Sequence, residues 1–182
     1  MVQPMTVRYV SADFLTSSHH IFGQLKVSQT GVTGLLSDPR NSYIEISDAS
    51  LVRIQQPDKV INYAQMLWLV KSQAVAVCIH KREYAGSTAV LRAGYTRVLP
   101  YHVEITTAIF EVTGTLDWSG RFEFSVLMTE GTNAFILLYD ALITSSFSSD
   151  LHIDSQVALI NRNYISTLVL TRKAPPEEIS DE

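Results

Sequence analysis

Short stretches rich in β-branched and aromatic residues, several of them alternating apolar with polar positions, dominate this chain. Such stretches, bounded by polar turns, are typical of β-strands, whose side chains point to opposite faces in turn. The strands predicted in the first part of the chain are Thr6–Val10, Ile21–Val27, Tyr43–Ile46, Leu51–Ile54, Met66–Val70 and Val75–Ile79. Those predicted in the second part are Val103–Ile109, Phe110–Trp118, Phe135–Ile143, Val157–Ile160 and Ile165–Leu170. The polar triplets Lys71–Gln73 and Asn161–Asn163 are predicted to turn two hairpins.

Helical periodicity is weak throughout the chain. Only Val32–Asn41 suggests a helical turn, and Gly34 and Pro39 limit it. Its counterpart in the second part, Val126–Asn133, contains Gly131 in place of such a turn. The pattern therefore predicts an all-β protein.

Many residues recur in the same order at a nearly constant distance. Thr16, Ile21, Gly23 and Leu25 match Thr107, Val112, Gly114 and Leu116 at an offset of 91. Asn41, Tyr43, Ile44, Asp48 and Ala49 match Asn133, Phe135, Ile136, Asp140 and Ala141 at an offset of 92. Leu69, Val75, Ile79 and Arg82 match Leu159, Ile165, Val169 and Arg172 at an offset of 90. The small differences between these offsets are those expected from loops, which tolerate changes of length. The recurrence therefore predicts a duplicated domain.

The recurrence predicts two tandem small β-barrels related by internal pseudo-symmetry. The first covers residues 1–82 and the second residues 96–173, with a linker over 83–95 that contains the extended piece Ala89–Leu91. Residues 174–182 form an acidic, proline-containing segment that is expected to be a disordered tail. Gly23 and Gly114 recur inside strands, where a glycine indicates a bulge or a bend that a small barrel needs in order to close.

Composition narrows the classes of function. Apolar residues make up 46% and charged residues 18% of the chain, which is typical of a globular protein with a core. The net charge of −4 argues against a strong non-specific nucleic-acid binder. The single cysteine, Cys78, cannot form an internal disulfide and is expected to be a buried apolar residue. No signal peptide and no membrane-spanning segment are recognised, so a cytoplasmic protein without a membrane partner is expected.

No convergent set of catalytic or metal-binding residues is recognised. His19 and His20 are neighbours on a strand and point to opposite faces, and His152 with Asp154 lacks a third ligand. Asp48 and Asp140 are interpreted as residues that shape the backbone at a strand bend. No catalytic residue, cofactor or metal is therefore expected. Both tryptophans, Trp68 and Trp118, are expected in the core.

Two segments of the second part carry a resemblance to a known family. Gly114-x-Leu116, followed by Asn133 and then Asp140-Ala141, resembles the first motif of Sm-like proteins. Residues 158–168 resemble the second Sm motif, which consists of a strand, a short polar turn and another strand. Asn133 lies nineteen positions after Gly114, farther than in Sm proteins, and the turn lacks the usual glycine. The whole chain also resembles an uncharacterised bacterial family of small domains, which implies no activity.

The resemblance implies an Sm-like or SH3-like barrel in each copy and a candidate site for single-stranded RNA. In Sm-like proteins the turn of the second motif reads RNA bases together with the asparagine of the first motif. The corresponding residues here are Asn133, Arg162 and Asn163 in the second copy, and Asn41, Lys71 and Gln73 in the first.

The function expected from the sequence is that of a non-catalytic protein-interaction or scaffold module of a cytoplasmic bacterial protein. Each small copy needs a partner surface, so the expected partner is another protein or a second copy of the chain. Two alternatives remain open at this point: an Sm-like protein that binds single-stranded RNA, and a sensor domain for a small ligand.

Overall fold

The computed structural model describes residues 7–86, 97–129, 133–148 and 150–171. The extended piece predicted at Ala89–Leu91, Gly131 and the acidic tail 174–182 lie outside the described residues. The first half, residues 7–86, contains β1 (Arg8–Leu15), β2 (His19–Val27), α1 (Gly31–Ser37), β3 (Tyr43–Arg53), β4 (Gln56–Val70) and β5 (Ala76–Ile79). The second half, residues 97–171, contains β6 (Val98–Thr106), β7 (Phe110–Ser119), α2 (Phe124–Thr129), β8 (Phe135–Ser145), β9 (His152–Asn161) and β10 (Thr167–Thr171). Strands dominate both halves, and the prediction of an all-β protein is confirmed.

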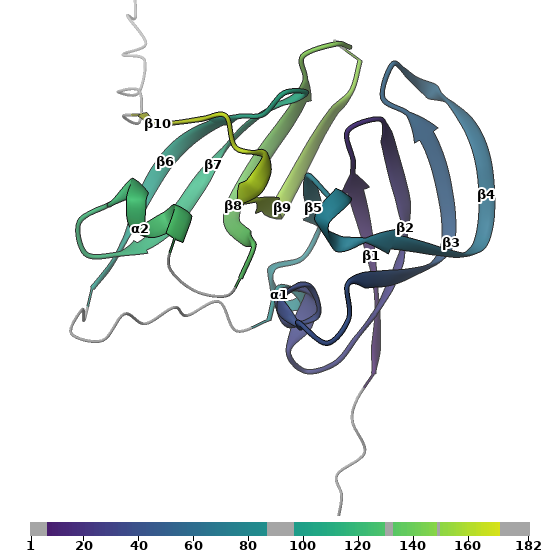
Figure 1. Cartoon of the computed structure of the whole chain (residues 1–182), viewed down its shortest axis with the longest axis horizontal. Helices are drawn as coiled ribbons and strands as arrows, with labels where there is room; N and C mark the ends of the chain where they lie inside the picture. The colour runs from purple at the N-terminus through teal and green to yellow at the C-terminus, as the bar shows by residue number, and fades with distance from the viewer. Residues whose placement is uncertain (1–6, 87–96, 130–132, 149, 172–182) are drawn as a thin grey trace, which may run out of the picture.

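All the strands belong to one antiparallel sheet. Its ten strands follow the order β10-β6-β7-β8-β9-β5-β1-β2-β3-β4, so β10 and β4 are its two ends and do not pair with each other. The strongly curved sheet places β4 at one end of the molecule and the strands β6 and β10 toward the other (Figure 1). Neither short helix is long and apolar enough to cross a membrane, and the described residues hold no other candidate.

The two halves share one strand order and one register. The order β5-β1-β2-β3-β4 of the first half recurs as β10-β6-β7-β8-β9 in the second. Ala12 pairs with both Gly23 and Ile79, and 91 residues later Val103 pairs with Gly114 and Leu170. The element order recurs as well, because each half places a short helix between its second and third strands in sequence.

The register corrects the predicted correspondence of the last block. Leu69 pairs with Ile44, whereas Ile160 pairs with Ile136 at the equivalent place in the second half. The structural offset there is 91 and not 90, so Leu69 corresponds to Ile160 rather than to Leu159. A slip of one residue along a strand matters, because it moves every side chain to the other face.

The hairpins that open the two halves are built by matching threonines. The Thr16 hydroxyl donates to the His19 carbonyl at 3.1 Å and accepts from the His19 N–H at 2.9 Å. The Thr107 hydroxyl donates to the Phe110 carbonyl at 3.1 Å and accepts from the Phe110 N–H at 2.8 Å. In each hairpin the hydroxyl closes a tight turn, which explains why this threonine recurs.

Matching bulges bend both halves at the recurring glycines. The register of β2 with β3 shifts at Gly23, and that of β7 with β8 shifts at Gly114. Opposite these glycines, Asp48 and Asp140 adopt left-handed backbone conformations, with φ of 49° and 48°. Aspartate tolerates this conformation better than most residues do. The interpretation of these four residues as shaping the backbone is therefore confirmed.

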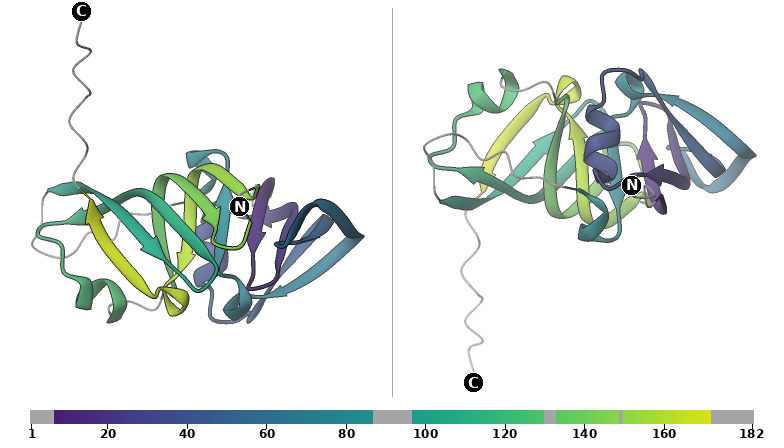
Figure 2. Two further views of the ribbon diagram at one scale, coloured as in Figure 1. Left: turned by 90° about the horizontal axis from the view of Figure 1, so that it is seen from above. Right: turned by 90° about the horizontal axis from the view of Figure 1, so that it is seen from below.

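The halves are joined by the pairing of β5 with β9, in which Ala76 lies opposite Ile160 and Ile79 opposite Val157. Each of the two cores contains residues from both halves. The first core includes Phe135, Val157 and Leu159 of the second half, and the second core includes Leu15, Ala76 and Cys78 of the first. Viewed from below, α1 lies in the middle of the molecule, between the two sets of strands (Figure 2).

Several predicted element boundaries are wrong. The triplets Lys71–Gln73 and Asn161–Asn163 do not turn hairpins, since β4 pairs with β3 while β5 pairs with β1 and β9, and β9 likewise does not pair with β10. Short 3-10 turns at Lys71–Gln73 and Arg162–Tyr164 connect these strands instead. The predicted strands Tyr43–Ile46 and Leu51–Ile54 fall on one bent strand, β3, that ends at Arg53. The second half also contains a helix, α2, where none is predicted.

Candidate interaction surface

The two cations predicted to bind RNA occupy equivalent positions and point toward backbone carbonyls. Lys71 and Arg162 each begin a 3-10 turn. The Lys71 ammonium group donates to the Asp38 carbonyl at 2.8 Å, and burial lowers the pKa of Lys71, partly offset by the charge of Asp38. The Arg162 guanidinium donates to the carbonyls of Leu127, at 3.1 Å, and Asn133. Lys71 therefore holds the residue that follows α1, and Arg162 connects α2 with Asn133, which precedes β8.

The remaining predicted RNA-binding residues are divided between structural contacts and open surface. The Asn133 side-chain oxygen accepts from the Phe135 N–H at 3.0 Å, and the exposed Asn163 donates its backbone N–H to the side chain of Asn161 at 3.1 Å. Asn41 and Gln73 are exposed. The structure brings Arg162 and Asn133 together, but through a main-chain carbonyl. RNA binding by these turns stays a prediction.

Asn161 is a structural residue that sequence reasoning assigned only to a turn. It is 1% exposed, and its side-chain amide donates to the Ala74 carbonyl of the first half at 2.9 Å. Its backbone N–H donates to the Val75 carbonyl at 2.9 Å. Asn161 therefore continues the β5–β9 junction beyond the last strand pair.

A polar cluster lies beside the junction and was not recognised in the sequence. The buried carboxylate of Asp13 contacts His20 at 2.6 Å and His80 at 3.2 Å. Strands β1 and β2 and the residue after β5 bring these three side chains together. His19 contacts Ser18 instead, and His152 and Asp154 are exposed on β9. In the described part of the chain, no group of three or more metal-type ligands is arranged to hold a metal ion.

Cys78 is fully buried on β5, as predicted. Burial, with a smaller contribution from the Asp13 charge, raises the pKa of the thiol far above its ordinary value. Because only the thiolate is reactive, we expect native protein to react with N-ethylmaleimide more than about a hundredfold more slowly than urea-unfolded protein. Mass spectrometry of timed samples measures both rates, and rapid modification of the native protein would contradict this burial.

A second contact between the halves lies on the surface. Arg82 donates to Asp140 at 2.5 Å and lies over the ring of Tyr139 at 4.8 Å. The hydrogen bond to Asp140 raises the pKa of Arg82. Since both charged side chains are more than half exposed, this ion pair adds little to stability.

One hollow of about 460 Å³ lies beside α1 and is lined by residues of the first half alone. Its charged residues include Asp38 and Arg40, which pair at 2.8 Å. Hydrogen bonds from Arg40 lower the pKa of Asp38 to about 2. The hollow therefore belongs to one half and does not lie between the two.

Both end strands of the sheet have an unpaired edge among the described residues. β4 is 15 residues long and pairs only with β3, and β10 pairs only with β6. Open edges present unpaired N–H and C=O groups that can pair with another strand. No proline interrupts the part of β4 from Lys59 to Val70, so the edge is suited to pairing.

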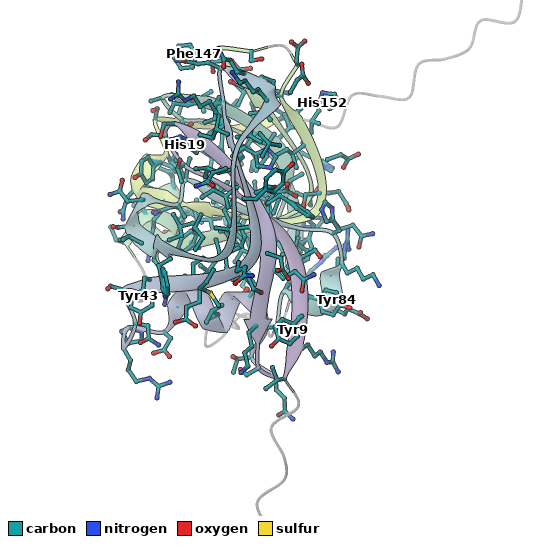
Figure 3. All side chains as sticks on the ribbon, turned by 90° about the vertical axis from the view of Figure 1, so that its right-hand side faces the viewer. Tyr9, His19, Tyr43, Tyr84, Phe147 and His152 are labelled. Atoms are coloured by element: carbon teal, nitrogen blue, oxygen red, sulfur yellow. The ribbon has the colours of Figure 1, made fainter. Side chains whose placement is uncertain are left out.

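Large apolar side chains gather on the outer face beside the β4 edge. Tyr43 lies opposite Val70, Glu45 opposite Trp68, and Ser47 opposite Met66. Directly opposite residues share one face of a sheet, and the four apolar ones, Tyr43, Met66, Trp68 and Val70, are exposed. We call these four residues the aromatic face. Figure 3, which views the molecule from this end, shows Tyr43 at the surface.

Trp68 is the most exposed member of the aromatic face. It is 62% exposed, and its indole N–H donates to Glu45 at 3.3 Å. The prediction that Trp68 lies in the core is therefore wrong. Trp118 is half-buried, and its ring lies against Phe122 with the centroids 5.5 Å apart.

The β4 edge and the aromatic face lie together at one end of the sheet. Large contiguous exposed apolar patches mark protein–protein or membrane interaction sites or ligand-binding grooves. Searches against protein-family models, curated proteins and solved structures find no match to this chain.

Proposed function

We propose that this protein is a non-catalytic interaction or scaffold module of the bacterial cytoplasm, which assembles with further copies of itself through β4 and β10. The observation that carries the proposal is the β5–β9 junction inside the chain. By the shared register, β9 corresponds to β4, and β5 corresponds to β10. The chain therefore makes this contact once internally, between β5 and β9. The equivalent strands β10 and β4, at the ends of the sheet, could make the same contact between two copies.

The proposed contact between copies takes its register from the internal junction. Val157 lies opposite Ile79 in the chain, and Ile160 opposite Ala76. Applying the offset of 91 places Met66 of one copy opposite Leu170 of the next. It likewise places Leu69 opposite Thr167, in an antiparallel pair of the same length.

Such a contact joins two different surfaces, so each copy has two neighbours. A heterologous contact of this kind closes into a ring when the rotation between copies permits, and otherwise continues as a filament. The assembly would leave no open β4 or β10 edge within a ring, which removes the aggregation hazard of both strands.

The proposal also covers the fold of each half and the origin of the pair. Each half is a small barrel of the Sm-like or SH3-like kind, and a duplication produced the pair. The shared strand order, the bulges at Gly23 and Gly114, and the threonine hairpins support a common origin. All of these features concern the backbone, which is in keeping with a module whose role is to present edges and faces.

A cysteine pair tests the proposed edge contact. We expect the variant Met66→Cys/Leu170→Cys to form disulfide-linked multimers under mild oxidation, because opposite residues of an antiparallel pair lie within reach of a disulfide. Non-reducing electrophoresis measures the products. The control Met66→Cys/Val169→Cys should form few multimers, since its cysteines would point to opposite faces. The single variant Met66→Cys identifies an alternative contact, because it forms a disulfide-linked dimer through this cysteine only if β4 of one copy lies against β4 of another.

Mass measurement of the wild-type protein provides the decisive outcome. We expect its mean mass in sedimentation experiments to rise with concentration as copies associate. A strict monomer at all concentrations, together with equal cross-linking in the double variant and its control, would overturn the proposal.

A further inference from the structure

We infer that α2 and the neighbouring aromatic residues of a second copy cover the aromatic face. This inference rests on the proposed self-association, and it adds a second surface to the edge contact. It commits to one occupant, the second half of another copy of this chain.

The first observation is a contrast in burial between equivalent residues. Tyr43 corresponds to Phe135, and Trp68 corresponds to Leu159. Tyr43 and Trp68 are 44% and 62% exposed, whereas Phe135 and Leu159 are 6% and 0% exposed. The same outer face of the sheet is therefore covered in the second half and open in the first.

The second observation is what covers that face inside the chain. Phe135 and Leu159 belong to the first core, together with Val32 and Leu36 of α1. Helix α1 contacts β8, and it lies in the middle of the molecule, between the two sets of strands (Figure 2). The first half thus covers the outer face of β8 and β9 with its helix and with the adjoining end of its core.

The third observation is a partly exposed aromatic surface at the equivalent place in the second half. Leu127 of α2 is buried, as is Leu36 of α1, while Phe124 at the start of α2 is exposed. Beside α2, the ring of Phe122 lies 5.7 Å from that of Tyr101 and 5.5 Å from that of Trp118. These three rings are only half-buried.

The two surfaces match in chemistry and position. Tyr101 and Trp118 occupy the places of Val10 and Val27, which are buried members of the first core. Applying the internal arrangement to two copies brings the half-buried rings beside α2 against Tyr43 and Trp68. Contacts between aromatic rings stabilise an interface beyond the effect of burying their area. This favours the aromatic surface beside α2, rather than a polar surface, as the partner of the aromatic face.

Fluorescence of Trp68 tests the inference. In the variant Trp118→Phe, which retains a ring beside α2, Trp68 is the remaining tryptophan. We expect its emission maximum to shift to shorter wavelength, and its quenching by acrylamide to fall severalfold, when the concentration rises through the association range. Emission of an exposed indole at every concentration would overturn the inference.

A matched pair of substitutions gives a second readout. Trp68→Ser should weaken association by about tenfold or more, as expected for an aromatic residue at the centre of an interface. Tyr9→Ser is the control, since Tyr9 is 61% exposed on the same outer face, and its counterpart Pro100 is also exposed. Equal effects of the two substitutions would contradict the inference.

The cysteine pair and the fluorescence of Trp68 together separate the two proposals. If Met66→Cys/Leu170→Cys cross-links while Trp68 stays exposed, the edge contact stands and the cover by α2 is wrong. If the variant does not cross-link and Trp68 stays exposed, both proposals fail.

Discussion

Replacing Asn161 by alanine should lower the free energy of unfolding by about 2–3 kcal/mol. The side chain is buried, and its amide donates to the buried carbonyl of Ala74 across the junction between the halves. Removing it leaves that carbonyl without a partner, and a buried polar group without a hydrogen bond costs about 1–3 kcal/mol. The cavity left by the side chain adds to this cost. Urea unfolding followed by circular dichroism measures the change.

Asn163→Ala is the matched control for this substitution. Asn163 is exposed, and it contributes its backbone N–H, which alanine retains, to the contact with Asn161. Its effect should therefore remain within about 0.5 kcal/mol. Comparable losses in the two variants would show that the Asn161 amide does not stabilise the junction.

Gly23→Ala should destabilise the protein by about 1–3 kcal/mol, the usual cost of forcing extra atoms into a packed site. A Cβ atom on Gly23 would lie 2.4 Å from a methyl group of Ile46 and 2.9 Å from the Ser47 carbonyl oxygen. The backbone oxygen belongs to the paired strand β3, so it cannot move away without disturbing the bulge. Thermal unfolding at low protein concentration measures the loss.

Gly114→Ala provides the comparison in the other half. The nearest atoms to a Cβ there are the Tyr139 carbonyl oxygen at 3.2 Å and the Leu138 Cβ at 3.3 Å. Such contacts require shifts of only a few tenths of an ångström, so the loss should be clearly smaller than for Gly23→Ala. The reverse ranking would mean that the two bulges do not have the packing described above.

The positions of most strands along the chain follow from the pattern of the sequence, but that of the edge strand does not. β4 begins at Gln56, whereas the pattern predicts a strand only from Met66. Residues 56–63 are exposed on both sides except for Pro57, so no alternation of buried and exposed positions marks them as a strand. The position of β4 at the edge also explains why the prediction for Trp68 is wrong. Trp68 lies in an apolar run that resembles a core strand, but its side chain is exposed.

The recurrence of residues predicted the shared backbone features well. Gly23, Asp48 and Thr16 recur because each meets a local requirement of a bulge or a turn. The offset of 90 matched Leu69 with the identical residue Leu159, but a leucine suits either face of a buried strand. Only the pairing of Leu69 with Ile44 identifies Ile160 as its counterpart.

The candidate site was less accessible from the sequence. A lysine or arginine in a polar turn is usually solvated, and the sequence contains no sign that Lys71 and Arg162 donate to the carbonyls of Asp38 and Asn133, which follow the helices. The Asp13 cluster unites residues as distant in the chain as His20 and His80. Surfaces that depend on which strand lies at the end of a sheet become visible only in three dimensions.

The pairing of β5 with β9 within one polypeptide has a consequence for regulation. Because both strands belong to one polypeptide, their pairing is indifferent to dilution. A pairing of β4 with β10 from separate molecules obeys mass action instead. The cell could then control the extent of assembly through the rate at which it synthesises this protein, without any ligand or covalent modification.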